Sequence, residues 1–317
     1  MRRSIITWSV IFGVFVAAFI GTVLTLNATT FSAGGFVRVY LDSLARGDVQ
    51  GALELPGVAV PDDAVDGLLD GDALAPLTGI RQLDDVDLGN GLHRVTVGYD
   101  LGRTAGTSSF VIEPAGPVLG VFTGWRFAES PIATIDVTVL HDDRFSANGV
   151  ELRADSTLPV AVVTPGLYVL DHESSVLAAE AVPVTALTPG EHIDASVDVQ
   201  ASEKFVEQVQ AELNSYLDEC ATQTVLMPSG CPFGQEISNR IESEPIWSIS
   251  AYPPVTIVPG SERGTWQMPS TPGAARLQVE VRSIFDGTLS TFDQNVSFTV
   301  QYLITFEEDG SLLITAQ

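Results

Sequence analysis

Residues 36–48 read FVRVYLDSLARGD, and residues 92–101 read LHRVTVGYDL. In the first stretch apolar side chains recur every three or four residues, which predicts an amphipathic helix. In the second they recur every other residue, which predicts a strand. A helix followed by antiparallel strands is typical of an α+β domain, which we expect at residues 30–130. The positions that carry the two periods are Phe36, Val37, Tyr40, Leu41 and Leu44 in the helix and Val95, Val97, Tyr99 and Leu101 in the strand.

The same order of patterns recurs near the C-terminus. SEKFVEQVQAELNSYLDECA (202–221) has the periodicity of a long amphipathic helix, and several strand candidates follow it. Between the two patterns, residues 131–201 hold short strand candidates separated by turns such as SANG and TPG. The expected fold class is therefore α+β, with domains at 30–130 and 202–317 separated by a small β-sandwich spacer at 131–201.

An apolar run without charged residues, IITWSVIFGVFVAAFIGTVLTL (5–26), lies near the N-terminus. At about 1.5 Å of rise per residue it is about 33 Å long, enough to cross a hydrocarbon layer of about 30 Å. Arg2 and Arg3 precede it and the next basic residue is Arg38, so the positive-inside rule places the N-terminus in the cytoplasm. We expect residues 1–27 to be a single-pass signal-anchor helix in the plasma membrane, with the chain after about residue 27 extracytoplasmic.

A cleaved signal peptide is the alternative for this segment. Such peptides have an apolar core of about 7–15 residues, followed by a cleavage site with small residues. The run at 5–26 is longer, and the following NATTFSAGG offers only a poor site, which ends at Ala33. The sequence therefore favours an uncleaved anchor and leaves cleavage open.

The chain has only two cysteines, Cys220 and Cys231. Pro228, Ser229 and Gly230 lie between them and favour a turn that brings the two together. A zinc site needs about four ligands, and a redox pair usually has the spacing C-x-x-C, so neither fits. Disulfides persist outside the cytoplasm. We therefore predict a structural disulfide, in agreement with the predicted topology.

The charge of the chain excludes one class of partner. With 40 acidic and 15 basic residues, the formal net charge is −25. Nucleic-acid binding depends on Lys and Arg side chains that neutralise phosphates, and the negative field of this chain repels phosphates. We expect no nucleic-acid partner.

The segment FVRVYLDSLARGDVQGALEL (36–55) resembles the opening helices of the NTF2-like superfamily, a cone-shaped α+β fold. An anchor followed by NTF2-like or cystatin-like domains resembles uncharacterised membrane-anchored extracytoplasmic proteins of actinobacteria. The arrangement is also similar to the teicoplanin-resistance-associated membrane proteins of Gram-positive bacteria. Those proteins carry a cytoplasmic zinc ribbon, whereas here only residues 1–4 precede the apolar run.

The resemblance implies a scaffold more than an activity. In NTF2-like enzymes, the cone holds polar catalytic residues, typically Asp or His. The residues expected to point into the cone here are apolar, namely Val95, Val97, Tyr99 and Trp125.

Residues capable of catalysis or metal binding are scattered. No metalloprotease, nucleophile-elbow or phosphate-loop motif occurs. We therefore expect no enzyme activity, no metal and no cofactor. Clustered carboxylates in turns leave calcium open, although the D-x-D-x-D-G loop is absent and a solvated acidic surface is favoured. The histidines are His93, His141, His172 and His192, and the acidic turns contain Asp62, Asp63, Asp66, Asp70 and Asp72, then Asp84, Asp85 and Asp87.

Three aromatic residues of the last domain, Trp247, Tyr252 and Trp266, are the candidate ligand or partner surface. The alternative is that they fill the core of that sheet. We expect a membrane-anchored extracytoplasmic binding or adaptor protein of the bacterial cell envelope, with an envelope protein as partner. A binder of a lipid or cell-wall fragment in an apolar cone is the second hypothesis, and a hydrolase is the third.

Overall fold

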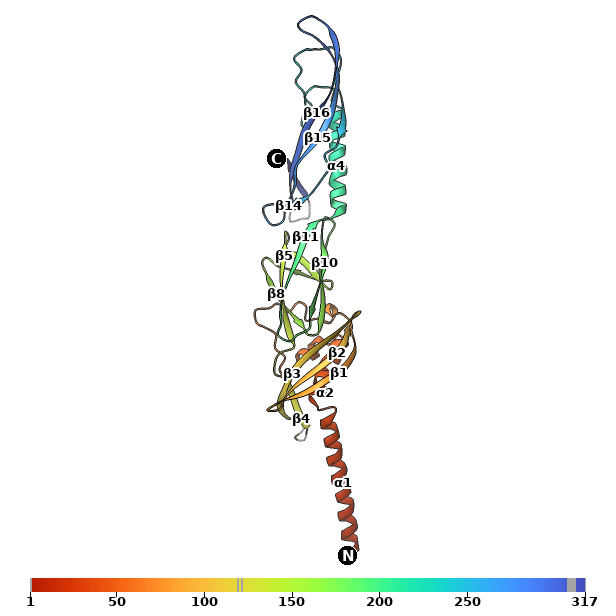
Figure 1. Cartoon of the computed structure of the whole chain (residues 1–317), viewed down its shortest axis with the longest axis vertical. Coiled ribbons are helices and arrows are strands. Elements are labelled where there is room, and N and C mark those ends of the chain that lie inside the picture. Colours follow the sequence, from red (N-terminus) through yellow and green to blue (C-terminus); the bar gives the residue numbers. More distant parts are fainter. Residues whose placement is uncertain (1, 119, 121, 307–311, 317) are drawn as a thin grey trace. The chain divides into compact units, whose positions relative to one another are not determined.

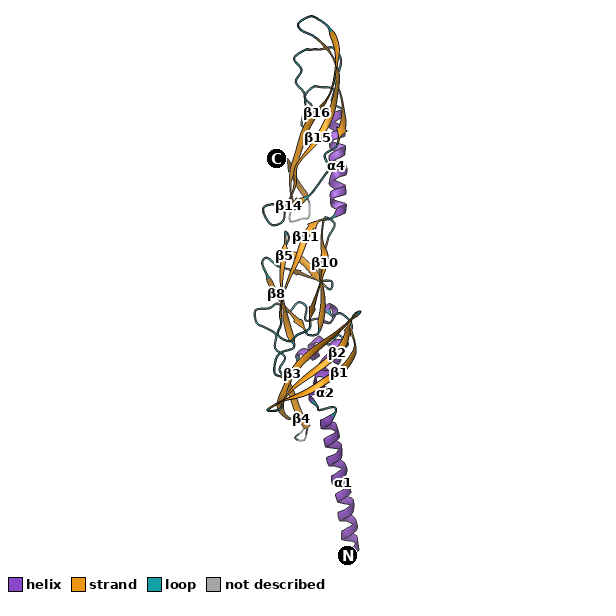
Figure 2. Cartoon of the chain, viewed as in Figure 1, coloured by secondary structure: helices purple, strands orange, loops and turns teal. Residues whose placement is uncertain are grey.

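The computed structural model describes residues 2–118, 120, 122–306 and 312–316. It has an N-terminal apolar helix and three β-sheets with a few further helices, so the α+β class is confirmed (Figures 1 and 2). The chain divides into two compact units. The first comprises Met1–Val139, Arg144–Asp171 and Ala181–Val197, and the second comprises Leu140–Asp143, His172–Glu180 and Asp198–Gln317.

Helix α1 (Arg2–Ala28) contains the predicted apolar run. Its segment Ile11–Ala28 is long and apolar enough to cross a bilayer, and none of that segment is buried within the protein. A signal sequence near an N-terminus passes the same test. The structure thus confirms the apolar helix.

The first sheet curls around α2 (Figure 1). Its four strands are antiparallel neighbours in chain order. Side chains of α2 pack on the concave face, where Val37, Tyr40 and Leu41 are fully buried. The helical and alternating patterns that predicted α2 and β2 are confirmed. The elements are α2 (Ala33–Ala45), α3 (Val49–Leu53), the 3-10 helix η1 (Gly71–Ala73), β1 (Leu77–Gly89), β2 (Leu92–Leu101), β3 (Thr104–Val118) and β4 (Phe122–Phe127).

The second sheet has seven strands in the order β7-β6-β9-β10-β11-β5-β8. The core around α2 continues into it, since Ile132, Ala161 and Val163 belong to the same cluster of buried residues. The predicted domain boundaries at residues 130 and 201 stay a prediction. The strands are β5 (Ile132–Leu140), β6 (Arg144–Ala147), β7 (Val150–Arg153), β8 (Leu158–Val163), β9 (Gly166–Glu173), β10 (Leu177–Ala186) and β11 (His192–Ala201).

The third sheet lies with α4 in the second unit. Its centre is the long hairpin β15–β16; β12, β13 and β14 pair with β15, and β17 pairs with β16. The Ser202 side chain caps α4 by accepting a hydrogen bond from Phe205 N at 3.2 Å. The elements are α4 (Glu203–Ala221), β12 (Arg240–Ile241), β13 (Ile246–Ala251), β14 (Val258–Pro259), β15 (Thr265–Arg282), β16 (Leu289–Phe306) and β17 (Leu312–Ala316).

The structure confirms the predicted helix at 202–221 as α4, and most of its predicted apolar face is buried. Phe205, Val209, Leu213 and Leu217 are buried. Tyr216, which the helical spacing predicts to face inward with them, is exposed, and its hydroxyl donates a hydrogen bond to Gly230 O. The hydroxyl of Tyr216 thus contacts the loop after the helix, and the helical period alone does not predict this contact.

Strand β15 joins two strand candidates of the sequence, GTWQM (264–268) and ARLQVEVRSIF (275–285), and ends at Arg282. Pro269, Pro272 and Gly273 interrupt the sequence pattern and predict a break. The structure keeps the strand intact and shifts its register against β16 between Met268 and Thr271. A local irregularity of this kind accommodates residues that cannot donate to the ladder. Pairing with β13, β14 and β16 maintains the strand on both sides of it.

Candidate functional site

Cys220 and Cys231 form the predicted disulfide, with Cα atoms 5.8 Å apart. It closes a loop immediately after α4. Within this loop, Gln223 Oε1 accepts a hydrogen bond from Ser229 N at 2.8 Å. Gln223 Nε2 donates to Ser229 O at 3.2 Å. The loop is therefore held by a covalent bond and by a paired side-chain amide.

Removing the disulfide is expected to destabilise the second unit. A crosslink over a loop this short stabilises by about 2–4 kcal/mol, mainly by restricting the unfolded chain. Urea unfolding of the full chain in detergent, followed by hydrogen exchange of α4, should show that loss for Cys220→Ala/Cys231→Ala. Val225→Ala is the control because that side chain is exposed in the same loop. Equal stability of the double variant and the control would contradict the expectation.

The indole of Trp247 belongs to the core beneath this loop. Its side chain is 5% exposed. Its Nε1 donates to Val225 O at 2.8 Å, and its ring packs against Phe233 at a centroid distance of 5.0 Å. Trp247 therefore supports the loop from inside.

The structure does not bring the three candidate aromatics to one surface. Trp266 is fully buried, and its ring lies 6.3 Å from that of His141. Tyr252 is 40% exposed. Its hydroxyl donates to Asp218 Oδ1 at 2.5 Å, which raises the pKa of the phenol. Trp247 and Trp266 point to the covered face of the sheet, as in the core alternative, and only Tyr252 remains accessible to a partner.

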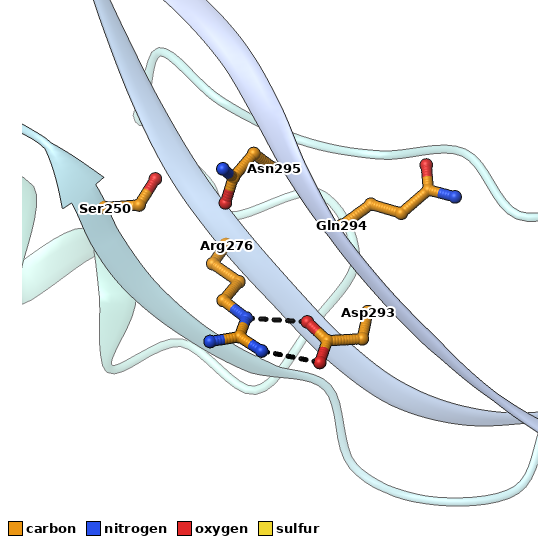
Figure 3. A pocket seen from close by; sticks show the side chains of 5 residues that line it. All are labelled: Ser250, Arg276, Asp293, Gln294 and Asn295. Atoms are coloured by element: carbon orange, nitrogen blue, oxygen red, sulfur yellow. Dashed lines mark hydrogen bonds and ion pairs between the residues drawn. The ribbon is translucent and has the colours of Figure 1, made fainter.

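A polar pocket of about 400 Å³ lies on the long hairpin (Figure 3). Arg276 donates two hydrogen bonds of 2.6 Å to the Asp293 carboxylate, and Gln278 Nε2 donates a third at 3.0 Å. The bond from Arg276, followed by that from Gln278, lowers the pKa of Asp293 to about 2. Both charges thus have a partner inside the protein. The pocket is lined by Ser250, Arg276, Asp293, Gln294 and Asn295.

The turn between β15 and β16 presents apolar side chains to solvent. We call Ile284, Phe285 and Leu289 the apolar tip; all three are exposed, and Phe285 is 98% exposed. Large apolar side chains grouped on a surface are typical of contact sites. An isolated exposed side chain would need no such explanation.

The backbone of this turn is well defined by hydrogen bonds. Ser283 N donates to Thr288 O at 2.9 Å, and Gly287 N donates to Ser283 O at 3.0 Å. The Ser283 hydroxyl accepts from Phe285 N at 3.3 Å, and Asp286 Oδ1 accepts from Thr288 N at 3.1 Å. The bond with Ser283, followed by those with Thr288, lowers the pKa of Asp286. The turn therefore holds Phe285 outward in a preorganised position, which reduces the entropy lost on binding.

The sequence analysis missed the apolar tip, although the sequence contains an indication of it. Turns are normally built from Gly, Pro, Asn, Asp and Ser. The segment RSIFDGT (282–288) has an Asp-Gly turn with Ile284 and Phe285 directly before it. Apolar residues in a turn depart from the usual turn composition, and a search for catalytic motifs does not detect them.

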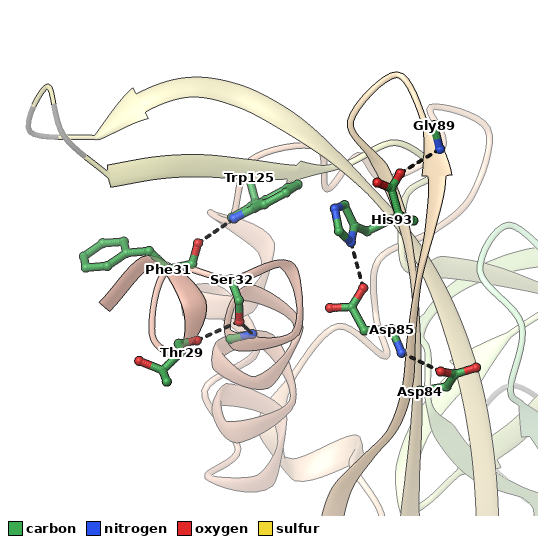
Figure 4. A network of polar contacts seen from close by, with 10 residues as sticks. Thr29, Phe31, Ser32, Asp84, Asp85, Gly89, His93 and Trp125 are labelled. Carbon is green, nitrogen blue, oxygen red and sulfur yellow. Dashed lines mark hydrogen bonds and ion pairs between the residues drawn. The ribbon is translucent and has the colours of Figure 1, made fainter. Parts of the chain in front are cut away.

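Three histidines lie beside aspartates, as Figure 4 shows for His93 and Asp85. Their Nδ1 atoms lie 2.7 Å from Asp85 for His93, 3.0 Å from Asp198 for His141 and 3.4 Å from Asp136 for His192. His172 is buried. The His93–Asp85 pair lies on the first sheet, whereas His192 and Asp198 of the other two pairs both lie on β11. Within the described part of the chain, no group of three His, Cys, Asp or Glu side chains is placed to hold a metal ion.

The prediction that Asp84, Asp85 and Asp87 lie in a turn is wrong, because they lie in β1, where pairing with β2 continues to Gly89. Several of the acidic residues accept hydrogen bonds from nearby backbone amides. Asp70 Oδ1 accepts from Asp72 N at 3.0 Å, Asp84 Oδ1 accepts from Asp85 N at 2.9 Å, and Asp87 Oδ1 accepts from Gly89 N at 2.7 Å. The bonds of Asp70 and Asp87 reach two residues along the chain and are of the Asx type that stabilises turns. They give these carboxylates a structural role in the folded chain.

Comparison with known proteins adds no information about function. No family model, no curated protein and no solved structure matches the chain. The apolar tip is the candidate functional site on its geometry alone.

Proposed function

We propose that this protein is a membrane-anchored extracytoplasmic adaptor of the bacterial cell envelope. In this proposal α1 stays uncleaved, and two NTF2-like or cystatin-like α+β domains flank a β-sandwich spacer. The apolar helix and the disulfide support the location, because disulfides persist outside the cytoplasm. The net charge of −25 argues against an anionic partner surface.

The observation that carries the adaptor function is the 98% exposure of Phe285 on an ordered turn. An aromatic side chain that enters a partner's pocket supplies much of the binding free energy at an interface. Ile284 and Leu289 extend the apolar area beside it. The partner is therefore expected to be an envelope protein with an apolar pocket of aromatic size.

The second hypothesis, a small-ligand binder, has less support. A ligand in the cone would lie on the concave face of the first sheet. Side chains of α2 occupy that face, where Val37, Tyr40 and Leu41 are fully buried. The pocket at Arg276 is polar and does not suit a lipid chain.

Photo-crosslinking in intact cells tests the proposal. A photoreactive phenylalanine analogue at Phe285 is expected to give a discrete protein adduct. The same analogue at Thr299, an exposed position of β16, should not give it. Adding Ile284→Ser and Leu289→Ser should reduce the adduct about tenfold or more, as for the loss of hot-spot contacts.

The outcomes separate the hypotheses. Adducts of equal yield at Phe285 and Thr299 would indicate random encounters and would reject the apolar tip as the site. Adducts to lipid or glycan alone, without protein, would favour the ligand binder. The three apolar side chains are exposed and contribute little to the core. We therefore expect the substituted variants to fold like the wild type.

A further inference from the structure

The end of α1 is joined to the β3–β4 hairpin by three contacts within the first unit. The rings of Phe31 and Phe122 stack at a centroid distance of 4.1 Å and an interplanar angle of 11°. Thr123 N donates to Asn27 Oδ1 at 3.0 Å. These contacts place the start of β4 against the last turn of α1.

The third contact comes from Trp125. Its Nε1 donates to Phe31 O at 2.7 Å (Figure 4). Phe31 is itself tied to the helix, since its N donates to Leu26 O at 2.8 Å. The position of the hairpin relative to the helix end is thus fixed by stacking and by hydrogen bonds on both sides.

The composition of the hairpin is compatible with a position beside a membrane. From residue 114 to residue 125 the sequence PAGPVLGVFTGW has no charged side chain. The flanking charges, Glu113 and Arg126, form an ion pair of 2.5 Å at the base of the hairpin. Val118, at the end of β3, is 42% exposed. The part of the hairpin nearest α1 is therefore uncharged and partly apolar.

The depth of the hairpin follows from the length of the apolar helix. The apolar run at 5–26 is about 33 Å long at 1.5 Å per residue, enough to cross the hydrocarbon core, and it ends directly before Asn27. Asn27 and Phe31 then lie at the outer interface of the bilayer. Phe122 and Trp125, which contact Phe31, lie at the same level, where aromatic rings are favoured.

We propose that the β3–β4 hairpin is a second, shallow membrane contact, which inserts Val118 and Phe122 into the interfacial region of the outer leaflet beside α1. This inference rests on the proposed function, in which α1 is an uncleaved anchor. One helix allows a domain to rotate and tilt above the bilayer. A second contact restricts that freedom and fixes the orientation of the first unit against the membrane surface.

Single-cysteine labelling tests this contact on the full chain. Both native cysteines are in the disulfide, so an introduced thiol is the sole labelling site. Val118→Cys carries an environment-sensitive fluorophore in phosphatidylcholine vesicles that contain lipids with a nitroxide near the headgroup. Thr104→Cys is the matched control at the opposite end of β3, about 45 Å away along the strand. Val14→Cys reports on α1 itself.

We expect the headgroup nitroxide to quench the label at Val118 and to leave the label at Thr104 unchanged. A nitroxide deep in the acyl chains should quench the label at Val14. If the labels at Val118 and Thr104 respond alike while Val14 is quenched, the hairpin contact is rejected and the anchor stands. If Val14 is not quenched, the anchor is rejected and the hairpin contact with it.

Discussion

Replacing Trp266 by alanine is expected to lower the free energy of unfolding of the second unit by about 3–5 kcal/mol, as for other large-to-small substitutions in cores. The side chain is fully buried in β15. It pairs across the sheet with Ile304, which is also fully buried. Its removal leaves a cavity as well as losing the transfer free energy of the indole, and both effects act in the same direction.

Trp266→Phe separates the contribution of packing from the cost of burying the indole N–H. Among the described residues, Trp266 Nε1 is buried without a hydrogen-bond partner. Phenylalanine removes that unpaired donor, so part of the lost packing is offset. We therefore expect a clearly smaller loss for Phe than for Ala. Urea unfolding of the full chain in detergent, with hydrogen exchange of β15 and β16, measures both, and equal losses would contradict this account.

Replacing Tyr40 by alanine is expected to destabilise the first unit by a similar amount, about 3–5 kcal/mol. Its ring is fully buried in edge contact with Phe110 and Phe127, at centroid distances of 5.9 and 5.2 Å. Its hydroxyl lies 2.9 Å from Thr164 O and 3.2 Å from Pro131 O, and it donates to these carbonyls. The side chain thus joins α2 to the segments beside β5 and β8.

Tyr40→Phe tests the hydroxyl alone. In this variant Pro131 O still accepts a hydrogen bond from Thr164 N at 2.9 Å. Thr164 O is therefore the carbonyl that loses its hydrogen bond from the Tyr40 hydroxyl. An unpaired buried acceptor costs about 1–3 kcal/mol. Hydrogen exchange of α2 under native conditions measures the difference. A loss for Phe as large as that for Ala would show that the ring contacts contribute little.

The same tyrosine gives the first unit a pH dependence. Burial, followed by the field of Tyr168, raises the pKa of Tyr40 well above its usual value, and burial also raises the pKa of Tyr168. A raised pKa means that folding favours the protonated phenol. This contribution is complete below the unfolded pKa of about 10 and is lost as the pH rises above it. The melting temperature of the first unit should therefore fall more steeply above about pH 10 in the wild type than in Tyr40→Phe.

Local patterns in the sequence were enough to predict several elements. Helical spacing predicted α2 and α4, alternation predicted β2, and the apolar run predicted α1. The disulfide followed from the turn residues and the inferred compartment. Each of these depends on neighbours within about twenty residues, and a period or a turn is determined by that local chain.

The tertiary structure alone decided which faces are covered. Trp247 and Trp266 alternate correctly for strands, but only the packing of the second unit shows that they face inward. Phe285 lies outside any period, and its exposure depends on the absence of a neighbouring element at the turn in the described part of the chain. The continuity of β15 through Pro272 likewise depends on its partners. Burial and strand pairing are set by segments distant in sequence, and local spacing carries no information about them.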